Sequence, residues 1–230
     1  MAGREDLFQQ ALNEGHAAAW DQDWERAAAA YRRAVEEFPD RAKGWTNLGL
    51  ALMNLHRHEE ALQAYLRAAV LAPNDPLPLE KIALLSERVG NIPEAVKAAL
   101  KAAELYINQR EVEKAIQNWS HVTMLDPEHA LARSRLALIY ERLNQPQKAV
   151  TEYLALASVF QRSGYVDKAQ QMVEKAAQLM PDSAEVKQAR ALLQSGQLLP
   201  RPVRPKGGTG PIRMAQVKQA TQGSKPSGLE

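Results

Sequence analysis

The feature that most constrains this chain is a pattern of residues that recurs every 34 positions. Four residues of the window 42–75 have counterparts 34 positions earlier: Ala61 and Ala27, Tyr65 and Tyr31, Ala68 and Ala34, Pro73 and Pro39. A fixed period of this length, with small residues at set places, is typical of stacked helix pairs. Because each pair packs only on its neighbours, such a chain folds without a central core. The period therefore predicts an all-α repeat array.

The same window resembles the tetratricopeptide repeat (TPR). The family pattern is an early Trp, a Leu-Gly pair, then Ala, an aromatic residue, Ala and a closing Pro, met here by Trp45, Leu48, Gly49, Ala61, Tyr65, Ala68 and Pro73. The resemblance implies a right-handed TPR-like helical solenoid of about eleven helices over residues 4–195. The expected helices lie near 4–20, 23–37, 41–54, 57–71, 76–89, 92–108, 111–124, 128–143, 146–162, 165–179 and 182–194.

The spacing of the alanines that open each second helix changes beyond about residue 76. These alanines are Ala27, Ala61, Ala95, Ala115, Ala149 and Ala169, so the steps are 34, 34, 20, 34 and 20. A step of 20 has room for one helix and a turn, which predicts three-helix variant units with a 54-residue period. Gly90, Asn144 and Gly164 each stand five residues before one of these alanines, where a left-handed residue would end a helix.

Residues 196–230 differ in composition from the repeats. They hold five of the thirteen prolines and six basic residues against one acid, a net charge of +5 that leaves −3 on residues 1–195. With few large apolar residues to offset its ordering entropy, this segment is predicted to be a disordered basic tail. It could serve as a linker, as a short motif bound by another protein, or as a non-specific contact with nucleic acid or anionic membrane. Nucleic acid is the weaker option, because the cations have no interleaved aromatic residues for stacking.

Composition and motif spacing argue against catalysis. The chain has no cysteine, which excludes disulfides, thiolate metal sites and cysteine nucleophiles. Its five histidines show no metal-ligand spacing, and the KGGTG stretch at 206–210 lacks the Lys-Ser/Thr of a phosphate loop. We therefore expect no enzyme, no cofactor and no metal. With no secretory signal and no apolar run of roughly 18 residues, we also expect a cytoplasmic protein without a membrane span.

The resemblance also implies a binding groove. In the family, the first helix of each pair lines the groove, and its sixth position, often Asn, contacts the backbone of a bound peptide. This position corresponds to Asn13, Asn47, Lys81 and Arg135, with Lys101 in the shared helix 92–108. An Asn amide can donate to and accept from an extended backbone at once, and the three cations could bind an acidic segment. Three positions further along lies a mostly apolar strip, formed by His16, Leu50, Leu84 and Leu138.

These residues predict a non-enzymatic scaffold or adaptor that holds a partner peptide or helix in a concave groove. The alternative is a regulatory or tethering repeat segment of a larger multidomain protein, with the basic tail as linker. The alternative for the groove residues is that Asn47 only braces its helix and the cations are ordinary surface residues. The family's two-carboxylate clamp for chaperone C-termini is not expected, because Leu12, His16 and Leu77 replace clamp residues.

Overall fold

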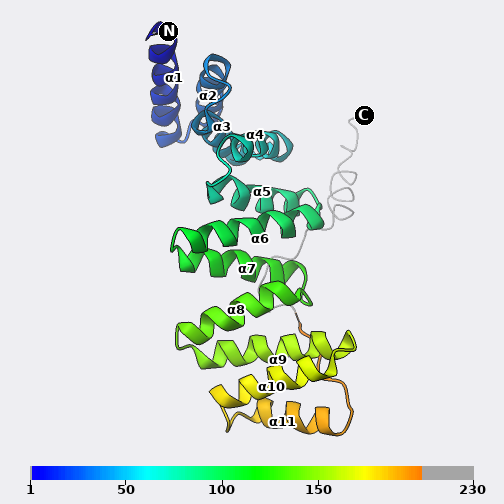
Figure 1. Ribbon diagram of the computed structural model, residues 1–230. Coiled ribbons are helices and arrows are strands. Elements are labelled where there is room, and N and C mark those ends of the chain that lie inside the picture. Colours follow the sequence, from blue (N-terminus) through cyan, green and yellow to red (C-terminus); the bar gives the residue numbers. More distant parts are fainter. Residues whose placement is uncertain (1, 204–230) are drawn as a thin grey trace, which may run out of the picture. The chain divides into compact units, whose positions relative to one another are not determined.

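The computed structural model describes residues 2–203, with side chains from residue 4 onward, and this part of the chain is all-α (Figure 1). It contains eleven helices: α1 (Ala2–Trp20), α2 (Trp24–Glu37), α3 (Ala42–Asn54), α4 (His58–Leu71), α5 (Pro76–Arg88), α6 (Ile92–Asn108), α7 (Val112–Leu125), α8 (Ala130–Arg142), α9 (Pro146–Arg162), α10 (Val166–Leu179) and α11 (Ala184–Gln194). The predicted all-α fold is confirmed, and every helix boundary lies within two residues of its predicted position.

The described chain divides into two compact units, which are considered separately. The first runs to Leu105 and the second starts at Tyr106. In the first unit, the consecutive helices from α1 to α5 pack on one another. In the second unit, the same holds for α7 to α11, and α11 also contacts α9. Packing between sequence neighbours is what a repeat array requires.

The periodic residues form the core of each unit. The six alanines that open the second helices are all completely buried, and their small side chains let neighbouring helices approach closely. Gly49 lies against the ring of Tyr65, such that a methyl group on its Cα would be 2.8 Å from Tyr65 Cε2. Gly15 has the same relation to Tyr31 one repeat earlier. The 34-residue pattern is therefore a packing pattern.

The turns between paired helices share one backbone geometry. A residue with positive φ stands five positions before each buried alanine, and these residues are Gln22, His56, Gly90, Arg110, Asn144 and Gly164. The prediction of left-handed residues at Gly90, Asn144 and Gly164 is confirmed. The N–H of the residue after each of these positions closes the turn with a hydrogen bond, as when Asn91 donates to the carbonyl of Ser86 at 2.8 Å. Gly196, with φ of 71°, ends α11 in the same way.

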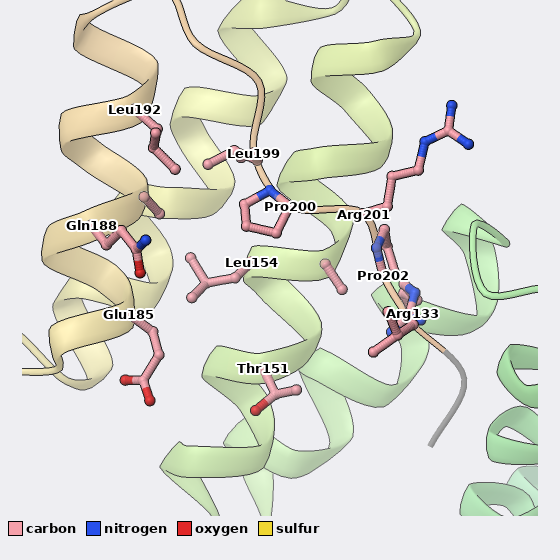
Figure 2. A pocket seen from close by; sticks show the side chains of 13 residues that line it. Arg133, Thr151, Leu154, Glu185, Gln188, Leu192, Leu199, Pro200, Arg201 and Pro202 are labelled. Carbon is pink, nitrogen blue, oxygen red and sulfur yellow. The ribbon is translucent and has the colours of Figure 1, made fainter. Parts of the chain in front are cut away.

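No further helix follows this last turn in the described residues. Instead, residues 197–203, here called the strap, run as a coil over α9 beside α11 (Figure 2). Leu199 of the strap is buried among Ala157, Val173 and Ala189. The predicted disorder from residue 196 is therefore wrong for residues 197–199, because one leucine and its backbone find partners on α9. Residues 204–230 of the predicted tail lie outside the described residues.

Candidate functional site

The first candidate surface is the part of the predicted groove that belongs to the first unit. Asn47 of α3 lies with its Nδ2 3.0 Å from Nε2 of His16 on α1. The His16 ring in turn meets Tyr31 edge to face, with 5.8 Å between ring centroids. The structure thus brings together two of the predicted groove positions from successive repeats. It also shows that the amide nitrogen of Asn47 contacts the protein itself, which agrees with the bracing role considered as the alternative.

The other groove positions of the first unit are at least partly open to solvent. Asn13 is exposed, and its Oδ1 accepts a hydrogen bond from Gln9 Nε2 at 3.0 Å. Lys81 forms an ion pair with its neighbour Glu80 at 2.8 Å. Leu50 is one of the exposed large hydrophobic residues of the chain.

Four residues complete the predicted set. Leu84 on α5 is half-buried, and Lys101 on α6 is exposed. Arg135 and Leu138 are exposed on α8, which belongs to the second unit. A groove that runs through all eight residues stays a prediction.

The second surface, beneath the strap, was not predicted. Its central residue is Gln161 near the end of α9. The Gln161 Nε2 donates to the carbonyl of Gln197 at 2.8 Å, and its Oε1 accepts from the N–H of Leu199 at 2.8 Å. One carboxamide therefore binds two main-chain groups of the strap, one as donor and one as acceptor. This is the chemistry expected of an Asn clamp, but it is performed by a Gln at a different position.

Side chains of α9 bind both main-chain polar groups of Leu199. Its carbonyl accepts a hydrogen bond from Arg162 Nη2 at 2.8 Å and a longer one from Ser158 Oγ at 3.5 Å. With the Gln161 contact, both the N–H and the C=O of Leu199 are satisfied by α9 side chains. A buried segment needs such partners, since an unpaired main-chain group costs roughly 1–3 kcal/mol.

One side chain anchors the strap. Leu199 is 2% exposed, whereas the adjacent Leu198 is 57% exposed. The Leu199 side chain packs against small residues of α9, α10 and α11, with Leu154 and Leu192 bordering the cluster. Pro200 and Pro202 follow the anchor and have no N–H that would require a partner on the protein. The strap is thus bound by one apolar side chain and by main-chain contacts.

The strap borders a cavity of about 310 Å³ on the surface of the second unit (Figure 2). Besides the strap, its walls come from α8, α9 and α11, including Arg133, Thr151, Leu154, Glu185, Gln188 and Leu192. At the α8 side, Arg201 of the strap lies 3.8 Å from Glu128, an exposed ion pair of small energetic weight.

A buried ion pair forms one wall of this cavity. Arg133 Nη1 donates to Glu152 Oε2 at 2.6 Å, and Arg133 Nε donates to the carbonyl of Pro127 at 2.5 Å. Burial raises the pKa of Glu152 above its ordinary value, while the charge of Arg133 opposes this shift. Because the arginine already has two partners, we assign it a structural role.

The strap site and the predicted groove are related by the repeat. Three predicted groove residues have counterparts 54 positions later: Lys101 and Ala155, Arg135 and Ala189, Leu138 and Leu192. All three counterparts line the cavity under the strap. Gln161, Ser158 and Arg162 were missed because isolated polar residues near a helix end carry no sequence signal of their own, whether buried, as Ser158 is, or half-buried, as Gln161 and Arg162 are. The Leu-Leu-Pro stretch at 198–200, shortly after the last helix, was the available signal.

No group of three or more His, Asp or Glu side chains in the described residues 2–203 has an arrangement that could hold a metal ion. Among the helices of this part of the chain, none is both long and apolar enough to cross a bilayer.

The helix pairs, their buried alanines and their shared turns define a helical-repeat protein. The family model described as Tetratricopeptide repeat matches residues 12–76 and 100–164, which together exceed half of the chain. The chain therefore belongs to the tetratricopeptide repeat family. The resemblance based on the window 42–75 is confirmed.

Similar proteins include two with the name Peroxisomal targeting signal receptor. The one from Kluyveromyces lactis is 30% identical over 86 residues, and the one from Eremothecium gossypii is 33% identical over 86 residues. Each match covers 37% of this chain and 15% of the relative, so this chain spans only a small part of their length. Among solved structures, a chain of the CopN-Scc3 complex is 27% identical with a TM-score of 0.46, covering 49% of this chain and 68% of that one.

Proposed function

We propose that this protein is a non-enzymatic scaffold that acts in the cytoplasm and binds an extended segment of a partner protein. The segment lies along the first helix of each helix pair and along the shared helix α6. The observation that carries the proposal is the strap. A stretch of non-helical chain lies on the second unit, over residues related by the 54-residue period to predicted groove positions. Two relatives whose names describe receptors for a targeting signal agree with a peptide-binding role.

Each groove residue has a proposed role. Asn13 and Asn47 contact the backbone of the bound segment, with the Asn47 oxygen facing the ligand while its nitrogen contacts His16. The exposed or half-buried leucines supply apolar contacts: Leu50, Leu84 and Leu138. The cations favour an acidic partner segment: Lys81, Lys101 and Arg135.

The test is capture of partners from a lysate of the source cell by the wild-type chain and by Asn47→Ala/Lys81→Glu. Loss of a groove anchor costs on the order of 2 kcal/mol, which corresponds to roughly 30-fold weaker binding of any identified partner. The matched control is Gln63→Ala/Arg67→Glu, which makes similar changes on α4, outside the predicted groove. If the groove variant retains full affinity for every partner, this role of α3 and α5 is wrong.

A second candidate is a regulatory or tethering repeat segment of a larger multidomain protein. The observation that favours it is that the chain matches only 15% of the length of the receptors named above. The complete reading frame of the gene separates the two candidates, because a further domain after residue 230 favours tethering.

A further inference from the structure

The strap lies on α9 and α11 as a peptide lies on a receptor. We propose that this face is a binding site for a segment in which a leucine is followed by proline. The strap is then the resident occupant that a partner segment of the same chemistry displaces. The inference deepens the proposed function and rests on it, because it names the partner class for the second unit.

Apart from the exposed ion pair between Arg201 and Glu128, the polar contacts of the site recognise the main chain of the strap rather than its side chains. Gln161 and Arg162 bind the carbonyls of residues 197 and 199 and the N–H of residue 199. None of these contacts depends on the identity of the strap residue. A segment from another chain can therefore make the same hydrogen bonds in the same register.

Selectivity arises at one side-chain position. The Leu199 pocket is closed by Ala157, Ala189 and Val173, so a branched aliphatic side chain fits and a polar one does not. The positions after the anchor suit proline, which needs no acceptor for an N–H and loses little backbone freedom when bound. These features together select a leucine–proline pair.

The resident strap leaves part of the site unfilled. The cavity of about 310 Å³ lies between the strap, Arg133, Thr151 and Gln188. A partner segment whose side chains enter this cavity gains contacts that the strap lacks. Against this gain stands the tether, because a short linker gives the strap an effective concentration in the millimolar range. In the wild-type chain the strap therefore suppresses binding of weaker segments.

The test uses a fluorescent peptide with the strap sequence, Gln-Leu-Leu-Pro-Arg-Pro-Val, titrated against full-length protein. Leu199→Ser removes the anchor of the resident strap but leaves the site intact, so we expect the variant to bind the peptide at least about tenfold more tightly than wild type. The matched control is Leu198→Ser, which changes the exposed neighbour and should bind as weakly as wild type. A peptide with Ser in place of the second Leu should bind none of these proteins, whereas Ser at the first Leu should have little effect.

A second variant guards against loss of folding in Leu199→Ser. It replaces residues 197–203 with a Gly-Ser stretch of equal length, and circular dichroism reports whether the helices remain. If a folded variant gains no affinity for the peptide, the proposal is overturned. If both variants unfold, the strap is a structural cap and the proposal is overturned as well. Failure here leaves the first-unit groove untouched, since Asn47→Ala/Lys81→Glu tests that surface independently.

Discussion

At the scale of the residue, the glycine–tyrosine pairs explain why the repeat pattern is so specific. Gly49 is inside α3, where alanine would be favoured by about 1 kcal/mol of helix propensity. A methyl group there would nevertheless lie 2.8 to 3.0 Å from three ring atoms of Tyr65. Because the ring is buried and cannot move away freely, we expect Gly49→Ala to lower the free energy of unfolding by about 1–3 kcal/mol, measured by urea denaturation.

The control for this prediction is a double-mutant cycle with Tyr65→Leu. If the clash with the ring is the cause, Gly49→Ala costs less in the Tyr65→Leu background, and the coupling exceeds roughly 0.5 kcal/mol. A stabilising effect of Gly49→Ala in the wild-type background would mean that the ring shifts at little cost. The glycine would then need another explanation than close packing.

The binding residues also show what a sequence reveals at this scale. The family resemblance predicted that an Asn side chain contacts the extended backbone of a bound peptide, and in the second unit the carboxamide of Gln161 makes contacts of this kind with the strap. Its position could not be predicted, because the partner groups lie 36 and 38 residues further along the chain. Asn47 and His16 were predicted as separate positions of the groove, and the direct contact between them was not expected.

At the scale of the element, the repeat determines the turns more strongly than residue type does. Gln22, His56 and Arg110 have positive φ, although such a backbone conformation is uncommon for any residue with a side chain and of these three only His is enriched in it. The left-handed conformation of Gly90 and Asn144 could be predicted from their residue type. At Gln22, His56 and Arg110 it follows only from the place of the residue, five positions before a buried alanine. The helix boundaries could be predicted because they, too, follow the repeat. The strap was not, because an average over residues 196–230 hides a single leucine that fits a pocket.

The turn at Gln22 offers a test of this interpretation. Glycine relieves the cost of a left-handed residue, about 1–2 kcal/mol, but adds entropy to the unfolded chain. We therefore expect Gln22→Gly to raise the free energy of unfolding by about 0.5 kcal/mol in chemical denaturation. Asp21→Gly is the matched control one position earlier, where φ is not positive, and it should lower stability. Equal effects of the two changes would contradict a special backbone requirement at residue 22.

At the scale of the whole molecule, an array in which helices contact mainly their neighbours implies that a destabilising substitution affects mainly the helices near it. In such chains, stability is approximately a sum of repeat and interface contributions, and parts can open separately. Val173 on α10 is 1% exposed and packs in the second unit. We expect Val173→Ala to cost about 2 kcal/mol, and to speed amide hydrogen exchange in α9, α10 and α11 much more than in α1 to α4.

The matched control for this last prediction is Val70→Ala on α4, where the valine is 71% exposed and the change should alter stability by less than about 0.5 kcal/mol. The exchange pattern distinguishes two kinds of cooperativity. Faster exchange confined to the second unit means that the units are stabilised by their own contacts. If Val173→Ala speeds exchange equally in α1 to α4, the described helices unfold as one cooperative body. A peptide bound in place of the strap would then stabilise the first unit as well, and binding at one surface would influence the other.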